Sequence, residues 1–146
     1  MTALPRVQLA LNVADVDAAV DFYSRLFDAE PARERPGYAN FVIADPPAKL
    51  VLFEGPEGGT LNHLGVETQT AEEVTAAEAR LGGSGLRTTG VEDTECCYAA
   101  KTETWVEAPD GLAWEYYVRT GDSEVLQNTP MATPDGDAAS PCCAPA

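Results

Sequence analysis

Two pairs of adjacent cysteines, Cys96-Cys97 and Cys142-Cys143, are the residues of this chain best suited to bind a soft metal or metalloid. A disulfide framework normally joins cysteines that lie far apart, whereas a bond between neighbours closes a strained small ring and constrains no useful loop. In a reducing compartment these cysteines should be free thiols. Metal or metalloid binding, or redox chemistry, is therefore favoured over structural crosslinking.

His63 and Glu115 could supply harder ligands to a metal. His63 is the only histidine in the chain, and a single histidine is more often structural than a ligand. Its neighbour Asn62 should point to the opposite strand face. Glu115 alternates with the aromatic residues on either side of it, so its carboxylate should face away from them. Such a carboxylate is costly to bury unless it is paired or metal-bound, although this face could also be exposed to solvent.

The composition excludes two classes of partner. The 146 residues carry a net charge of −15 with nine Lys and Arg, which is the wrong sign for a phosphate backbone, so we expect no nucleic-acid partner. No apolar run approaches the roughly 20 residues that a membrane span needs, and the N-terminus lacks the pattern of a signal peptide. We therefore expect a cytoplasmic protein that does not enter a membrane.

One folded domain, which we expect over residues 1–119, must position these residues. The remaining segment, 120–146, is rich in Pro, Ala, Asp, Ser and Thr and contains no Lys or Arg. Such a composition buries too little apolar surface to offset the entropy of ordering, which predicts a flexible tail. Cys142 and Cys143, near its end, either capture soft metals and pass them inward or have no role.

The domain divides into two halves with the same order of elements, at about 5–55 and 60–119. Each half begins with an alternating strand, RVQLALN or LNHLGVET, followed by a helix and three strand-like runs. With an offset of 55 residues, Gln8 falls on His63, which places a polar residue at the same strand position in both halves. The repeated unit is therefore βαβββ.

The helix boundaries follow from their caps. Asp15 caps the first helix, and Thr70 with Glu73 forms a capping box for the second, which Gly82-Gly83 should end. We expect helices over 16–27 and 71–81, and strand-like runs around 32–35, 38–44, 50–55, 86–89, 102–108 and 113–119.

The stretches LNHLGVET, TECCYA and APDGLAWEYY together resemble those of the organoarsenical carbon–arsenic lyases and their cadmium-induced relatives. These proteins belong to the vicinal oxygen chelate superfamily, which includes glyoxalase I and the extradiol dioxygenases. The resemblance covers roughly residues 5–119. It implies an α+β fold in which two βαβββ modules form a half-open barrel around one divalent metal.

By position, the resemblance implies that Gln8, His63 and Glu115 bind the metal. One amide oxygen, one imidazole and one carboxylate form a facial set like the 2-His-1-carboxylate arrangement. Such a set leaves open positions on non-haem Fe(II) for substrate and dioxygen. Manganese, nickel and cobalt remain open as alternatives to iron.

Glyoxalase I-like members supply a fourth protein ligand from the last strand of the first half. Aligning Pro46 with Pro109 places Leu52 opposite Glu115, so this chain has no carboxylate at that position. Three ligands with vacant positions suit oxygen activation better than a four-ligand isomerase site. Glu54 lies on the same strand face as Leu52 and stays open as an alternative ligand.

The resemblance also implies that Cys96 and Cys97 bind the arsenic of a trivalent organoarsenical. An arsenical with one organic group has two positions for sulfur, and two neighbouring thiols in an irregular loop can chelate it. The alternatives are small buried hydrophobes or thiols that sense oxidation. A structural zinc site is less favoured, because its cysteines normally need spacer residues. The loop 97–103 is expected to act as a lid over the metal.

The function that the resemblance implies is an Fe(II)-dependent dioxygenase of arsenic detoxification, which cleaves the carbon–arsenic bond of methylarsenite or trivalent aromatic arsenicals and releases arsenite. Two alternatives stay open: a cytosolic protein that binds cadmium or arsenite without turnover, and an extradiol-type dioxygenase acting on a catechol-like substrate. No acid or base is assigned, although Tyr98, Tyr116 and Tyr117 are candidate proton donors. The oligomeric state, including a homodimer, is also open.

Overall fold

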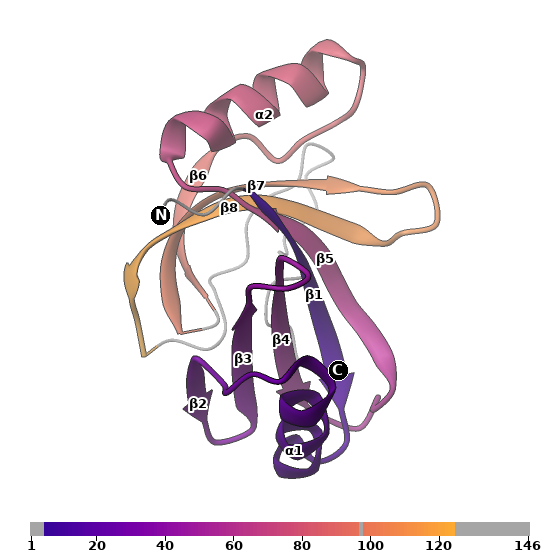
Figure 1. Cartoon of the computed structure of the whole chain (residues 1–146). Coiled ribbons are helices and arrows are strands. Elements are labelled where there is room, and N and C mark those ends of the chain that lie inside the picture. Colours follow the sequence, from indigo (N-terminus) through magenta and orange to yellow (C-terminus); the bar gives the residue numbers. More distant parts are fainter. Residues whose placement is uncertain (1–4, 97, 125–146) are drawn as a thin grey trace.

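One curled sheet of eight strands, accompanied by two helices, makes up the domain (Figure 1). The computed structural model describes residues 5–96 and 98–124. Within these residues, no helix is long and apolar enough to cross a membrane. The elements are β1 (Arg6–Val13), α1 (Val16–Phe27), β2 (Arg33–Arg35), β3 (Tyr38–Ile43), β4 (Ala48–Glu54), β5 (Thr60–Glu67), α2 (Ala71–Gly83), β6 (Glu92–Cys96), β7 (Ala99–Glu107) and β8 (Ala113–Asp122).

The strand order β2-β3-β4-β1-β5-β8-β7-β6 has an internal two-fold arrangement. β1 and β5 pair antiparallel at its centre, and each also pairs in parallel with the last strand of its own half, β1 with β4 and β5 with β8. The sheet curls into a half-open barrel (Figure 1). The predicted α+β fold of two βαβββ modules is therefore confirmed.

Side-chain caps set the helix boundaries, as predicted. Asp15 caps α1, which covers Val16–Phe27 as expected. Thr70 Oγ1 accepts a hydrogen bond of 3.1 Å from the backbone nitrogen of Glu73, within the predicted capping box. The second helix ends at Gly83, slightly later than expected, because both glycines remain helical.

The outer part of the second module differs from the prediction. Residues 86–89 form no strand, and Thr88 makes only an isolated bridge with Val106. The edge strand is β6, whose sequence EDTEC offers no apolar alternation. Charged side chains are typical of an exposed sheet edge. Cys96 therefore ends a strand and is fully buried, which corrects its placement in an irregular loop.

The lid predicted over 97–103 is wrong. β7 begins at Ala99, so most of this segment is hydrogen-bonded between β6 and β8. β8 in turn continues to Asp122, beyond the predicted end of the last strand. Cys97, Cys142 and Cys143 lie outside the residues that the structure describes.

The sheet separates two apolar clusters. Leu50 and Leu52 of β4 pack on one face of the sheet, against α1. Val51 points to the other face and lies in the barrel interior with Trp105 and Cys96. The alternation of β4 therefore decides which of its residues can reach a site inside the barrel.

Candidate metal site in the half-open barrel

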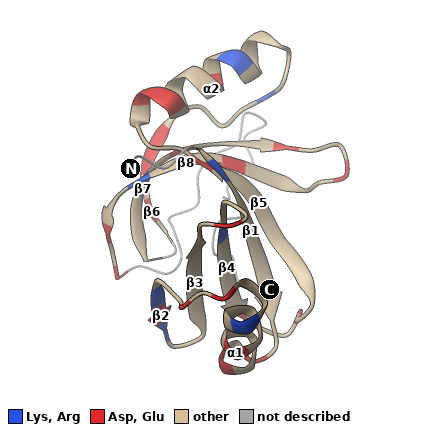
Figure 2. Cartoon of the chain, in the orientation of Figure 1, with Lys and Arg blue, Asp and Glu red and all other residues tan. Residues whose placement is uncertain are grey.

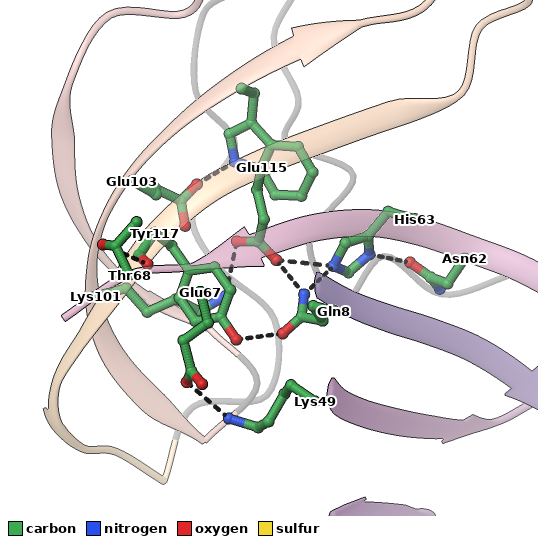
Figure 3. Close-up of polar contacts among 11 residues, drawn as sticks. Gln8, Lys49, Asn62, His63, Glu67, Thr68, Lys101, Glu103, Glu115 and Tyr117 are labelled. Carbon is green, nitrogen blue, oxygen red and sulfur yellow. Dashed lines mark hydrogen bonds and ion pairs between the residues drawn. The ribbon is translucent and has the colours of Figure 1, made fainter. Parts of the chain in front are cut away.

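Gln8, His63 and Glu115 meet in the barrel interior, where they project from β1, β5 and β8 (Figure 3). Their exposed fractions are 3 %, 0 % and 0 %. Glu115 Oε2 lies 2.7 Å from Gln8 Nε2 and 2.9 Å from His63 Nε2, and the two nitrogens are 3.3 Å apart. The fold thus brings the three predicted ligands together, and metal binding by them stays a prediction.

A glycine that sequence reasoning missed lets these side chains approach one another. Gly65 of β5 pairs with Gln8 on one side and with Glu115 on the other. A Cβ at this position would lie 2.8 Å from Cγ of Glu115 and 3.4 Å from Nε2 of Gln8. The first of these distances is too short for two carbon atoms, so the site requires glycine here.

We expect Gly65→Ala to destabilise the fold by about 1–3 kcal/mol, because the new methyl group displaces the Glu115 side chain. Divalent-metal affinity should fall by about tenfold or more, since the ligand loses its position. Gly121→Ala is the matched control in a strand, because its Cβ would meet its nearest neighbour at an ordinary 3.9 Å. Thermal unfolding and anaerobic metal titration measure both effects. Wild-type metal affinity in Gly65→Ala would contradict this packing.

The second ring nitrogen of His63 is held by Asn62. Asn62 Nδ2 donates to Asn12 Oδ1 at 3.0 Å, which leaves Asn62 Oδ1 as an acceptor 2.8 Å from His63 Nδ1. His63 Nδ1 therefore donates a proton, and Nε2 faces the carboxylate. The expectation that Asn62 points away is wrong, because a bulge in the β1–β5 pairing places it beside the ring.

The donor atoms fit a divalent metal. With Nδ1 protonated, His63 Nε2 and Glu115 Oε2 are two acceptors 2.9 Å apart, and a cation between them removes their repulsion. Adjacent donors around an octahedral ion with bonds of about 2.1 Å lie about 3 Å apart, close to the separations found here. The described residues contain no cluster of three His, Cys, Asp or Glu, so a metal bound here would need the amide of Gln8 as its third donor.

Tyr117 positions this amide. Its hydroxyl donates to Gln8 Oε1, which turns Nε2 toward Glu115. A metal ligand must present the oxygen, and a half-turn of the amide exchanges the two atoms. The Tyr117 hydroxyl can then accept from the nitrogen, because a hydroxyl both donates and accepts. Burial raises the pKa of Tyr117 well above its usual value, so the phenol keeps its proton.

Lys101 also reaches the site and was missed by sequence reasoning. Its Nζ lies 3.2 Å from Glu115 Oε1, and the residue is 4 % exposed. Burial lowers the pKa of Lys101, but the carboxylates of Glu115 and Glu103 outweigh this and raise it overall. Burial raises the pKa of Glu115, but its contacts with Lys101, His63 and Gln8 outweigh this and lower it to about 2. Glu115 is therefore ionised and able to bind a cation.

Glu103 is a second buried carboxyl group that sequence reasoning missed. Trp105 Nε1 donates to Glu103 Oε2, and Oε1 has no hydrogen-bond partner among the described residues. Burial raises the pKa of Glu103 to about 7, against the opposing charge of Lys101. The group can therefore exchange a proton near neutral pH. Both Lys101 and Glu103 belong to the stretch 97–103, for which a lid is predicted from the sequence.

The position of a fourth ligand is held by Val51 and not by Leu52. Gly65 pairs with Glu115, and the corresponding pair in the first module is Ala10 with Val51. Leu52 belongs to the cluster under α1, so the proposed alignment was wrong by one residue. Both residues are apolar, so neither adds a fourth ligand to the three predicted ones.

Glu54 points away from the metal site and toward the start of α1. Its Oε2 accepts a hydrogen bond of 2.9 Å from the backbone nitrogen of Val16. A carboxylate at this place satisfies one of the unpaired amides of the first turn and suits the positive end of the helix. Glu54 is therefore excluded as the fourth ligand.

We expect Glu54→Ala to lower the free energy of unfolding by about 1 kcal/mol, because α1 loses an acceptor at its first turn. The affinity for a divalent metal should not change. Glu57→Ala, which removes an exposed carboxylate nearby, should change neither quantity. Denaturant unfolding and metal titration distinguish these outcomes, and weaker metal binding in Glu54→Ala would restore this residue as a ligand.

Cys96 lies in the barrel interior, in the same cluster as Trp105. The ring of Trp105 is 5.2 Å from that of His63, centroid to centroid, so the sulfur belongs to the apolar wall beside the site. Cys96 is disulfide-bonded, and its partner lies outside the described residues. The expectation of a free thiol is therefore wrong for Cys96 in this structure.

The three candidate tyrosines occupy different places. Tyr117 contacts the ligand set, as described above. Tyr116 accepts a hydrogen bond of 3.2 Å from Arg80 of α2, outside the barrel. Tyr98 packs edge-on against Tyr38 with ring centroids 5.0 Å apart, at the pocket that contains Gln8. Of these, Tyr116 faces α2 and therefore does not donate a proton at the site.

A half-open barrel of two βαβββ modules, with polar side chains that meet in its interior, is typical of one protein superfamily. The chain belongs to the glyoxalase/bleomycin resistance protein/dioxygenase superfamily, whose family model matches residues 6–116. It is 54 % identical over 143 residues to the cadmium-induced protein CadI of Mycobacterium tuberculosis (strain ATCC 25618 / H37Rv), covering 96 % of this chain and 93 % of the relative. It is 49 % identical over 144 residues to the trivalent organoarsenical cleaving enzyme of Thermomonospora curvata, covering 97 % and 90 %.

The fold also matches solved structures. The Mn(II)-bound glyoxalase from Novosphingobium aromaticivorans superposes with a TM-score of 0.56 at 19 % sequence identity, covering 85 % of this chain and 42 % of that protein. At this identity the likeness shows the shared fold alone. The predicted membership of the superfamily, and the resemblance to arsenical-cleaving and cadmium-induced relatives, are confirmed.

Proposed function

We propose that this protein is an Fe(II)-dependent dioxygenase that cleaves the carbon–arsenic bond of trivalent organoarsenicals and releases arsenite in the cytoplasm. The observation that carries the proposal is the convergence of Gln8, His63 and Glu115 in an interior that also contains Cys96. The identity of 49 % to a trivalent organoarsenical cleaving enzyme supports the same class of substrate.

Gln8, His63 and Glu115 would hold the ion, and bound Fe(II) would supply the activation of dioxygen. The hydrogen bond from His63 Nδ1 to Asn62 would keep the imidazole oriented toward the ion. Lys101 would hold the free oxygen of Glu115, which leaves Oε2 for the metal. The chain would therefore keep its ligands on one side of the ion and leave the other side for substrate and dioxygen.

Cys96 and Cys97, in their dithiol form, would bind the arsenic. Two sulfur–arsenic bonds would replace the two hydroxyl groups of methylarsenite, which leave as water with the two thiol protons. The disulfide of Cys96 must first be reduced, and a cellular thiol in a reducing cytoplasm would supply the electrons. The substrate would then be held beside the wall formed by Trp105.

The overall reaction balances for methylarsenite and dioxygen. CH3As(OH)2 and O2 contain the same atoms as As(OH)3 and formaldehyde. Arsenic stays trivalent, and the methyl carbon supplies all the electrons that dioxygen takes up. Cleavage therefore needs no external reductant once the cysteines are reduced.

Anaerobic reconstitution with several divalent metals tests the proposal. Full-length protein, reduced by a thiol, is loaded with Fe(II), Mn(II), Co(II) or Ni(II) and then mixed with methylarsenite in air. We expect arsenic speciation to show arsenite release with Fe(II) and far slower release with the other ions. Equal release with every ion, or release from metal-free protein, would contradict an iron-dependent dioxygenase.

The second candidate is a protein that binds cadmium or arsenite without turnover. The identity of 54 % to a cadmium-induced protein favours it. It would use the cysteines alone, so cadmium should bind tightly and stoichiometrically after the loss of His63. An enzyme instead requires His63 for turnover, which separates the two functions.

A further inference from the structure

Basic residues gather around the proposed site although the chain is acidic. The sequence has nine Lys and Arg against 24 Asp and Glu. Arg33, Lys49, Lys101 and Arg119 nevertheless line the pocket that contains Gln8 and His63. Figure 2 shows that acidic residues lie on both helices and on β6. The pocket therefore carries positive charge that the composition does not predict.

The carboxylates beside this pocket are shared between cations. Asp122 accepts from Arg33 at 2.6 Å and also from Arg119. Glu115 pairs with Lys101 at 3.2 Å, and Glu103 is a second acidic group that acts on this lysine. Asp122 cannot neutralise both of its arginines, so positive charge is left over at Arg33 and Arg119.

Glu67 compensates the charge of Lys49 only in part, because Arg6 shares the same carboxylate. Its Nζ lies 3.1 Å from Glu67 Oε2, and Arg6 lies 2.8 Å from the other oxygen of the same carboxylate. The two cations and their single anion are largely buried. A cluster of like charges at low exposure is unfavourable unless a further anion joins it.

Arg33 has an unused donor at this pocket. Its side chain is 16 % exposed, and one of its terminal nitrogens donates to Asp122. Its Nε is buried and has no hydrogen-bond partner among the described residues. A buried donor without a partner costs about 1–3 kcal/mol. The fork of a guanidinium matches a carboxylate, so an anionic ligand would satisfy this atom.

The pocket can hold a small polar group. Its cavity volume is about 20 Å³, and about 10–15 Å³ holds one water, so the pocket has room for a group of the size of a carboxylate. Aromatic rings form part of its wall, since the centroid of Tyr38 lies 5.6 Å from that of Phe53 and 5.0 Å from that of Tyr98. Cations and aromatic rings therefore line the same space.

We infer that this pocket selects organoarsenicals whose organic group carries a negative charge, such as a carboxylate, and that Arg33 binds this charge. Lys49 and Arg119 line the same pocket and add to the attraction. The substrate class rests on the proposed function, whereas the preference for an anion over a neutral molecule of the same shape does not require turnover. Methylarsenite would bind without this contribution.

Benzoate and benzamide, which have the same shape and differ in charge, test the preference without turnover. In titration calorimetry of full-length, Fe(II)-loaded protein under argon, benzoate should bind at least about tenfold more tightly. Arg33→Gln should remove this preference, and Arg119→Gln should reduce it. Arg25→Gln, which removes an exposed charge on α1, should preserve it. Equal affinities would overturn the inference, as would a preference that survives both pocket variants because the anion binds iron alone.

Carboxymethylarsenite and carbamoylmethylarsenite link the preference to a substrate. Each contains, with one O2, the atoms of arsenite and a two-carbon aldehyde, glyoxylate or its amide. The ratio of kcat/KM for the acid to that for the amide should be at least about ten and should fall toward one in Arg33→Gln. Equal turnover of both would overturn the inference and leave the proposed function standing. If neither these two compounds nor methylarsenite releases arsenite while benzoate is preferred, the proposed function fails and the anion pocket stands.

Discussion

His63→Ala should abolish Fe(II) binding and arsenite release while leaving the capture of methylarsenite by reduced protein intact. His63 is the only histidine in the sequence, and its Nε2 faces Glu115 at 2.9 Å. Loss of one of three ligands leaves two donors, which do not hold iron against water. Anaerobic iron titration, arsenic speciation in air, and calorimetry with methylarsenite measure the three quantities separately.

Two further variants, one with an intermediate expected effect and one control, test this result. Asn62→Ala removes only the hydrogen bond to His63 Nδ1, so it should weaken iron binding by about 10–100-fold rather than abolish it. Gln69→Ala, an exposed amide after β5, should behave as wild type. Arsenite release that survives in His63→Ala would refute the metal site. Loss of arsenical capture in that variant would show that the thiols do not act independently of the iron.

Cys96→Ser should lower kcat/KM for methylarsenite by at least about 100-fold at low substrate, while Fe(II) binding stays as in wild type. A hydroxyl does not replace a thiolate as a ligand for a soft metalloid, so the arsenic loses one of its two attachments. Serine is close in size to cysteine, which preserves the packing of this buried position. Steady-state kinetics with a thiol reductant and iron titration provide the two readouts.

The control for Cys96→Ser is a chain that ends at Glu124 and lacks Cys142 and Cys143. An earlier end at Thr120 would cut into β8 and remove Asp122, which binds Arg33. Unchanged activity of the shorter chain at low substrate would exclude a transfer role for the tail cysteines. Unchanged activity of Cys96→Ser would instead favour a dioxygenase acting on a catechol-like substrate, for which the cysteines are incidental.

Elements with local signals could be predicted from the sequence. The caps at Asp15 and Thr70 specify where both helices begin, and alternation specifies β1 and β5. β6 has no such signal, because its acidic residues belong to an edge strand that is stabilised by pairing with β7. The strand predicted over 86–89 is wrong because an apolar residue in a loop gives the same local signal as the start of a strand.

The meeting of the three side chains was predictable, whereas the residues that surround them were not. Gln8 and His63 occupy repeated strand positions, so the internal repeat relates them. Lys101 approaches Glu115 only because of the pairing of β7 with β8, whose register shifts at this point. Gly65 becomes necessary only when three strands bring their side chains together. Such contacts depend on strand registers, which no local pattern in the chain specifies.

We propose that three side chains hold one iron, and that dioxygen and a thiol-bound arsenical react there. The most direct test measures arsenite, formaldehyde and dioxygen together, for reduced, Fe(II)-loaded, full-length protein with methylarsenite. We expect each molecule of methylarsenite consumed to release one arsenite and one formaldehyde and to use one dioxygen, with no release under argon. Arsenite released at the same rate under argon, or capture of methylarsenite with no arsenite at all, would contradict it.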